Sequence, residues 1–225
     1  MKVVFTMGGI THYLSPLLDN VVRKGVDVVM VIPSVKDNQT IGKGVKLVNN
    51  EALYQVRYSE IKQGWYGKTI LTDLKTILNE EKPDIVVLGW PYFLQYFFDR
   101  QLRLLIKENN IKLIIREIPF QVPPFGQLSY FKENPVYDEN MILQSRGMSF
   151  FIRALCTMYI RKFVYKHADA TINYASCTYD ILPSYGVNKD KIFVTYNTPN
   201  TESLIRLREK VLSAPPLLEK KQRIL

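Results

Sequence analysis

The stretch Lys82-Pro83-Asp84-Ile85-Val86-Val87-Leu88 predicts the end of a helix followed at once by a buried strand. Proline disfavours a helical conformation in the residue before it, so the helix ends near Lys82, and Asp84 caps the turn. The four consecutive apolar residues 85–88 fit a strand that is covered on both faces. Strands of this kind are typical of a parallel sheet packed between helices.

The rest of the chain repeats this alternation of short apolar runs and helical patterns. Such alternation predicts an α/β fold with a Rossmann-like, doubly wound and mostly parallel sheet. The predicted strands are residues 3–7, 26–32, 85–88, 112–115, 170–173 and 192–196, and the predicted helices are residues 14–23, 68–81, 93–108, 141–166 and 178–183.

Length and composition indicate one folded domain with a tail. The chain has 225 residues, of which 47% are hydrophobic, which suffices for a domain of roughly 200 residues. Pro215 and Pro216 follow a polar, leucine-spaced stretch and favour an extended path. We therefore expect residues 1–200 to form the domain, and residues 201–225 to be an interdomain linker that leads into a further domain.

Several classes of protein are disfavoured by the residue counts. Cys156 and Cys177 lack the C-x-x-C spacing, and the two histidines are too few for a metal cluster, so we expect no structural zinc. The amino-terminal apolar run is too short for a signal peptide, and no uncharged stretch reaches 18 residues. These features predict a soluble, cytoplasmic chain without a bound cofactor.

The first loop at the expected ligand-binding edge is Gly8-Gly9-Ile10-Thr11-His12-Tyr13, because ligands of open parallel sheets lie beyond the carboxyl ends of the strands. Glycines allow close backbone approach, and the N-terminus of the following helix favours an anion, so the loop is a candidate phosphate or sugar site. A tight turn without a ligand is the alternative. His12 is a candidate general base. A third glycine at dinucleotide spacing is missing, which argues against hydride transfer.

Arg116 and Glu117 follow the predicted strand 112–115 and place opposite charges at the same edge. Together they fit a grip on phosphate and hydroxyl groups, although a plain salt bridge explains the pair equally well. The irregular, aromatic stretch 119–135 follows them and suggests a binding wall or a lid.

The predicted helix 141–166 carries the most concentrated positive charge of a chain whose formal net charge is +9. One interpretation is docking on an anionic membrane surface, with aromatic residues in the interface. A core helix whose basic side chains extend to solvent is the alternative. Nucleic acid is the least favoured partner, because no known recognition module accompanies the charge. The residues expected at the anionic surface are Arg153, Arg161, Lys162 and Lys166.

The last block of the domain contains an Ala168-Asp169-Ala170 strand entry, Ser176, a Gly186-Val187 turn and Lys191-Ile192-Phe193-Val194-Thr195-Tyr196-Asn197, in that order. This order resembles the amino-terminal half of family 4 glycosyltransferases of the GT-B fold. The glycine loop and Lys82-Pro83-Asp84 fall where the family has equivalent motifs. The resemblance implies one half of a two-domain enzyme of the retaining type, which transfers a sugar from a nucleotide-sugar donor, as in cell-surface polysaccharide synthesis.

The resemblance also implies roles for particular residues. This half would chiefly hold a glycan or lipid-linked acceptor and would be inactive alone, since the nucleotide sugar and the family's paired glutamates belong to the other half. Arg116 departs from the histidine that the family frequently has, and it cannot act as a base near neutral pH. Expected residues are Gly8 and Gly9 at the donor diphosphate, Thr11, His12, Tyr13, Trp90, Arg116 and Glu117 at the acceptor, and Asn197 and Asn200 between the domains.

Two other functions fit the same residues. A freestanding, non-enzymatic module that binds sugar or phosphate would use the same edge loops. A GT-B-type sugar-nucleotide epimerase is the other alternative, and it is less favoured because acid/base chemistry at a sugar carbon needs several carboxylates or histidines, of which the loops offer few.

Overall fold

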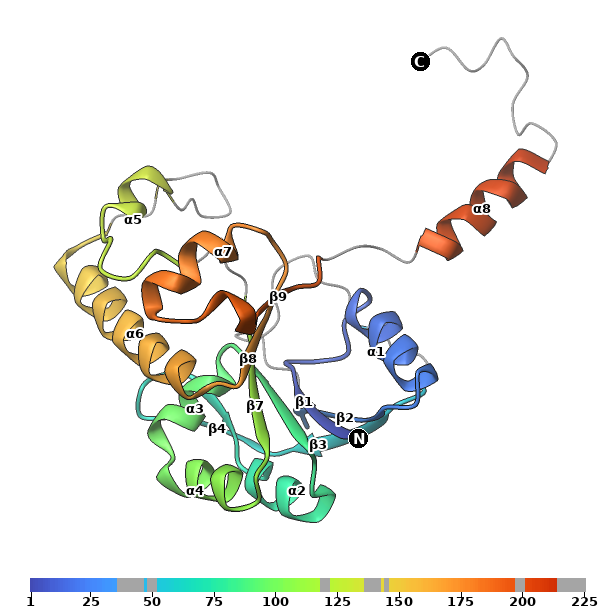
Figure 1. Cartoon of the computed structure of the whole chain (residues 1–225), viewed down its shortest axis with the longest axis horizontal. Helices are drawn as coiled ribbons and strands as arrows, with labels where there is room; N and C mark the ends of the chain where they lie inside the picture. Colours follow the sequence, from blue (N-terminus) through green and yellow to red (C-terminus); the bar gives the residue numbers. More distant parts are fainter. Residues whose placement is uncertain are drawn as a thin grey trace, which may run out of the picture.

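A computed structural model describes residues 1–35, 47, 52–117, 122–135, 143, 146–196 and 201–213, without the side chains of residues 201–203. Its centre is a seven-stranded sheet with the order β3-β2-β1-β6-β7-β8-β9, in which all neighbouring strands run parallel. The predicted α/β fold with a doubly wound parallel sheet is confirmed (Figure 1). The strands are β1 Lys2–Thr6, β2 Asp27–Pro33, β3 Gln55–Ser59, β6 Ile85–Gly89, β7 Lys112–Glu117, β8 Ala170–Asn173 and β9 Ile192–Val194.

The chain adds strands first on one side of β1 and then on the other. From β1 the chain moves outward to β2 and β3, returns to β6 on the other side of β1, and then moves outward to β9. In parallel sheets of this kind, the crevice at the reversal, beyond the carboxyl ends of the two strands, is the usual place for a ligand. Here that crevice lies between the loops that follow β1 and β6.

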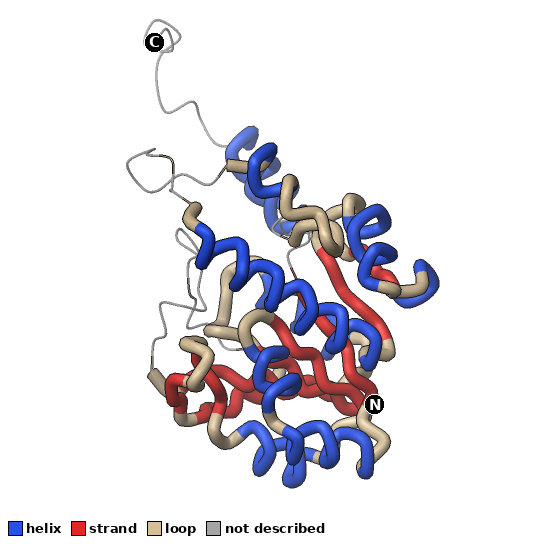
Figure 2. The backbone as a smooth tube through the Cα atoms, turned by 90° about the vertical axis from the view of Figure 1, so that its left-hand side faces the viewer, coloured by secondary structure: helices blue, strands red, loops and turns tan. Residues whose placement is uncertain are grey.

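Helices cover the sheet on both faces (Figure 2). Val4, Val86 and Leu88 belong to the larger core cluster, and Phe5 and Val87 belong to the cluster under α1, so neighbouring strand residues serve opposite faces. This double burial is the reason for the continuous apolar runs in the sequence. The helices are α1 Leu14–Arg23, α2 Leu74–Glu81, α3 Tyr92–Phe98, α4 Arg100–Glu108, α5 Tyr130–Glu133, α6 Met148–His167, α7 Thr178–Ile181 and α8 Thr201–Ser213.

Several predicted boundaries are wrong. Residues 69–71 form strand β5, Thr69–Leu71, which pairs with β4, Ile61–Gln63, in a small antiparallel sheet, so the helix predicted from residue 68 begins at Leu74. The helix predicted over 93–108 is interrupted at Asp99, whose carboxylate accepts a hydrogen bond from the Leu102 N–H at 3.1 Å and caps α4. Helix α6 begins at Met148, after residue 141. Strand β3 was not predicted.

The carboxyl-terminal stretch contains a helix where the sequence predicts a linker. Helix α8 covers Thr201–Ser213, and Leu204, Leu207 and Val211 on it are exposed. Residues 214–225, which include Pro215 and Pro216, lie outside the described residues. A linking role for 201–225 stays a prediction.

Candidate functional site

The candidate site lies where the carboxyl ends of β1, β6, β7 and β8 come together. Met7 follows β1, Trp90 follows β6, and Arg116 is the second-last residue of β7, in register with Gly89 of β6 and Ile172 of β8. The parallel register therefore brings side chains from distant parts of the sequence to one edge. Arg116 is central among them.

Arg116 is buried on the face of the sheet that α1 covers. Its side chain lines a small pocket of about 180 Å³, and the residue is 8% exposed. The guanidinium carbon lies 4.5 Å from the ring centre of Tyr174 and 6.0 Å from that of Phe5. One guanidinium nitrogen also donates to the Met7 sulfur at 3.4 Å. All of these contacts come from aromatic or weakly polar groups.

The guanidinium of Arg116 has no carboxylate partner among the described residues, since none of their ion pairs includes it. Burial lowers the pKa of Arg116 to about 10, so the side chain remains charged at neutral pH. Removing a cation from water costs several kcal/mol, and cation–π contacts return only about 2 kcal/mol. An anion that enters this pocket would gain from a charge that is already desolvated.

Glu117 points to the opposite face and does not act beside Arg116. Its carboxylate accepts hydrogen bonds from Arg161 Nε at 2.9 Å and from the Tyr165 hydroxyl, and the residue is 6% exposed. Successive residues of a strand point to opposite faces of the sheet, which separates Arg116 from Glu117. The expectation of a joint Arg116–Glu117 grip on one ligand is therefore wrong, as is that of a salt bridge between the two.

Arg161 is correspondingly absent from the exposed basic surface that the sequence suggests. Its side chain is 12% exposed, and burial lowers its pKa, but the Glu117 carboxylate more than offsets this and raises the pKa above the usual value. Arg161 thus serves the fold, whereas Arg153, Lys162 and Lys166 of α6 are exposed. Among the helices that the structure describes, none combines the length and hydrophobicity needed to cross a bilayer.

The loop after β1 approaches the site but offers fewer backbone donors than expected. The N–H groups of Leu14 and Ser15 both donate to the Thr11 carbonyl, at 3.2 and 3.0 Å, and Pro16 has no N–H. The first turn of α1 therefore offers an anion little beyond the dipole of the helix. Thr11 supplies a different feature, because its hydroxyl is buried and is the one buried side-chain polar atom without a hydrogen-bond partner among the described residues.

The other residues predicted in this loop flank the pocket. Tyr13 lines it together with Arg116, while His12 is exposed and packs edge-on against Tyr13, with 5.4 Å between ring centres. Gly9 is buried and Gly8 is half-buried. The structure thus gathers the loop and Arg116 at one place, and catalysis by His12 stays a prediction. Asn197 and Asn200 lie outside the described residues.

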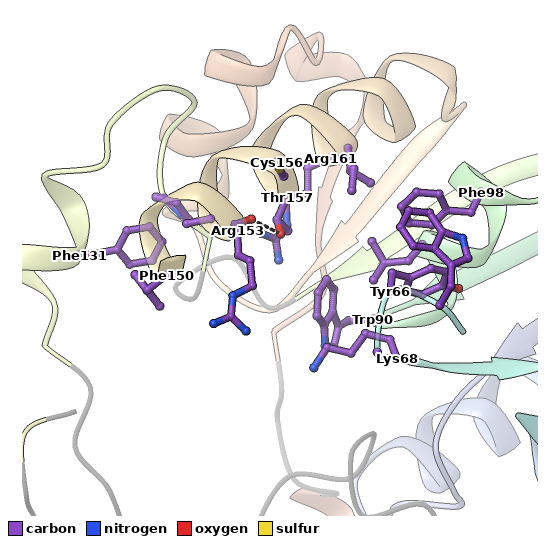
Figure 3. A pocket seen from close by; sticks show the side chains of 16 residues that line it. Tyr66, Lys68, Trp90, Phe98, Phe131, Phe150, Arg153, Cys156, Thr157 and Arg161 are labelled. Carbon is purple, nitrogen blue, oxygen red and sulfur yellow. Dashed lines mark hydrogen bonds between the residues drawn. The ribbon is translucent and has the colours of Figure 1, made fainter. Parts of the chain in front are cut away.

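A larger groove of about 830 Å³ opens on the other face of the same edge (Figure 3). Trp90 lies in it, 37% exposed, with Arg161 at 5.3 Å from its ring centre and Lys68 at 5.9 Å. One wall is formed by α6, and the opposite wall is formed by the turn between β4 and β5 together with α3. Trp90 and Arg116 therefore lie in different pockets, on opposite faces of the sheet, although both are expected at one acceptor site from the sequence.

Sequence reasoning missed most of the residues around both pockets. Phe5 was assigned only to the predicted strand 3–7, and Tyr174 was given no role, yet their rings contact Arg116. Position after strand β8 was the available signal for Tyr174. Trp65, Tyr66 and Lys68 of the groove had no such signal, because the β4–β5 hairpin was not predicted. In the described part of the chain, no group of three His, Cys, Asp or Glu side chains is placed to bind a metal.

No protein-family model and no curated protein sequence matches the chain. Similar solved structures include the UDP-N-acetylglucosamine 2-epimerase from Rickettsia bellii, with 14% identity over 95% of this chain and 49% of that one, at a TM-score of 0.48. A second UDP-N-acetylglucosamine 2-epimerase has 16% identity, over 88% of this chain and 48% of that one, and a TM-score of 0.48. The dTDP-glucose 4,6-dehydratase from Bacillus anthracis has 14% identity over 77% of this chain and 54% of that one, at a TM-score of 0.39.

The chain spans about half the length of these three structures. None of the three is a family 4 glycosyltransferase. Similarity at this level says nothing about substrate or reaction.

Proposed function

We propose that this chain is the acceptor-side half of a glycosyltransferase that moves a sugar from a nucleotide-sugar donor to an acceptor, and that Arg116 binds a phosphate group there. The observation that supports this most is the burial of Arg116 at the carboxyl edge of the sheet, where no described residue supplies it with a carboxylate partner. The motif order of the family supports the transferase activity, and the work of transfer is divided with a second domain.

The proposed role of Arg116 is electrostatic. When a sugar leaves a nucleotide diphosphate, negative charge grows on the leaving phosphate oxygen. A guanidinium that is already desolvated stabilises this charge more strongly than one in water, and its planar fork can bind two phosphate oxygens at once. The buried hydroxyl of Thr11, in the loop that flanks the pocket, has a hydrogen bond left to make.

The test uses the 225-residue chain and inorganic pyrophosphate as the probe, measured by isothermal titration calorimetry. We expect Arg116→Met to weaken binding at least 10-fold, and Arg116→Lys to be intermediate because it keeps the charge but loses the fork. Arg23→Met is the matched control, since Arg23 is exposed at the other end of α1 and its guanidinium donates to the Asn20 side chain at 2.9 Å. Equal affinities for wild type and Arg116→Met would sink the phosphate role.

Epimerisation is the competing reaction, and the site gives it less support. Glu117 is occupied by Arg161 and Tyr165, and the segments 7–13, 90–91 and 174–177 after β1, β6 and β8 contain no carboxyl group. A complete enzyme incubated with a sugar nucleotide alone separates the two reactions. Conversion of the sugar without an acceptor would indicate an epimerase, and product formation only when an acceptor is present would indicate transfer.

A further inference from the structure

The groove beside Trp90 has a lining that differs sharply from the Arg116 pocket. At one end Tyr66 stacks on Phe98 with 4.5 Å between ring centres, and Trp65 meets the Phe98 ring at 4.8 Å. Trp65 is nevertheless 82% exposed, so one whole side of this aromatic cluster has no cover. Burial raises the pKa of the Tyr66 phenol to about 12, which marks how apolar this end is.

The opposite end of the groove is also aromatic. Phe131 of α5 and Phe150 of α6 meet edge-on with 5.1 Å between ring centres, as Figure 3 shows at the far side from Phe98. The groove therefore offers an apolar surface along its length, between two walls that come from distant segments of the chain. An occupant with an extended apolar part would bury both ends.

The charges in the groove have a single sign. Lys68 and Arg153 are two of its three cations, and Figure 3 shows Arg153 reaching from α6 toward Trp90, with Lys68 beside the same ring. The third, Arg161, is already neutralised by Glu117. Arg153 bonds the carbonyl and hydroxyl oxygens of Ser149, and the described ion pairs include neither Arg153 nor Lys68. Two uncompensated cations thus lie within an apolar groove.

The lining also shows what the groove is not built for. Recognition of sugar hydroxyls relies on carboxylate and amide groups that accept and donate hydrogen bonds, and the residues that line this groove include no Asp, Glu, Asn or Gln. A bare carbohydrate would leave its hydroxyl groups unpaired against aromatic rings, which is costly. A hydrocarbon chain has no hydrogen bonds to lose on the same surface, and its burial there is favourable.

We propose that this groove binds an amphipathic phosphate, in which a phosphate ester is joined to a hydrocarbon chain. Lys68 and Arg153 bind the phosphate, and the chain lies along Trp65 and Phe98. The volume of about 830 Å³ is within the ~300–1,000 Å³ range of small-molecule sites and suits one molecule. The inference rests on the proposed function in one respect, since it identifies the acceptor as such an amphiphile.

The two tryptophans of the chain give a direct test, because Trp65 and Trp90 both lie in the groove. Farnesyl phosphate, added below its micellar concentration, is expected to change the intrinsic tryptophan fluorescence saturably. Farnesol should bind at least 10-fold more weakly, and inorganic phosphate should leave the spectrum unchanged. The variant Lys68→Glu/Arg153→Glu should lose at least 10-fold in affinity for farnesyl phosphate but not for farnesol, while Arg23→Glu serves as the charge control.

Each other outcome overturns the proposal. An unchanged spectrum, or equal affinities in wild type and Lys68→Glu/Arg153→Glu, removes the amphiphile site. A response only to phosphatidylglycerol vesicles, and not to the single amphiphile, indicates a bilayer surface instead. The proposed function is tested independently of this groove. Arg116→Met should bind farnesyl phosphate like wild type, and Lys68→Glu/Arg153→Glu should bind pyrophosphate like wild type.

Discussion

Among the described residues, Arg116 and Arg161 are both largely buried, and their charges are compensated in different ways. Arg161 is neutralised by Glu117, whereas Arg116 contacts the rings of Phe5 and Tyr174 and the Met7 sulfur. A buried ion pair belongs to the packing of the fold, whereas a buried cation without a counter-ion lowers the stability of the fold. The contrast gives opposite expectations for removing each charge.

Replacement of Arg116 by methionine should stabilise the chain. The substitution removes a desolvated cation and keeps an unbranched side chain that can pack against the rings of Tyr174 and Phe5. We expect the free energy of unfolding to rise by about 1–3 kcal/mol. Urea denaturation followed by circular dichroism measures this, and a loss of stability would show that the cation–π contacts outweigh the desolvation.

Replacement of Glu117 by glutamine should have the reverse effect. Arg161 would then be a buried charge without its counter-ion, which costs about 3–5 kcal/mol. The double variant Glu117→Gln/Arg161→Met should recover a large part of the loss, because it removes both charges. If denaturation shows additive losses in the double variant, the pair is not coupled as described.

At the scale of elements, one carboxylate connects three parts of the sheet layer. Glu81, in the last turn of α2, bonds Lys2 of β1 at 2.9 Å and Arg57 of β3 at 2.5 Å. Burial raises the pKa of Glu81, but the hydrogen bonds from Lys2 and Arg57 outweigh it and leave the pKa below the usual 4.5. The cluster joins strands that are not neighbours, because β2 lies between them.

This cluster predicts a defined pH dependence. The folded-state pKa of Glu81 is depressed, so its contribution to stability is complete above pH 4.5 and is lost as the pH falls through the folded value. Glu81→Gln should therefore be less stable than wild type at pH 7, with a difference that shrinks below pH 4.5. Unfolding curves at pH 7, 5 and 3.5 measure it, and a difference independent of pH would contradict the assignment.

At the scale of the whole molecule, the sheet and its helices form a unit to which α8 adds no core. The described side chains of α8, residues 204–213, are all exposed. Deletion of residues 197–225 should accordingly shift the thermal midpoint of unfolding by less than about 2 °C, the scale of a neutral surface change. A larger fall in the midpoint, measured by circular dichroism, would mean that this segment packs on the domain in solution.

The fold was more predictable from the sequence than the site. Strands β1, β2, β6, β7 and β8 are buried on both faces, which leaves uninterrupted apolar runs. Strand β3 lies at the sheet edge, where Gln55 and Tyr58 are exposed and only Ser59 is buried. Arg116 was predicted from its position at a strand end. Its isolation was not predictable, because it depends on Arg161, which lies 44 residues beyond Glu117 and neutralises it. The groove was not predictable either, because the β4–β5 hairpin that forms part of one wall has no distinct strand pattern in its sequence.

The place of β1 has a consequence for biosynthesis. Strand β1 lies between β2 and β6. The Lys2 side chain pairs with Glu81, and the Lys2 backbone N–H donates a hydrogen bond to the Asp84 carboxylate, both about 80 residues later. At ~5–20 residues per second on the ribosome, β6 follows β1 after roughly 4–16 s. Until then one edge of β1 is open and its apolar side chains lack half of their cover. During that interval, the unpaired edge of β1 is available to other chains and to chaperones.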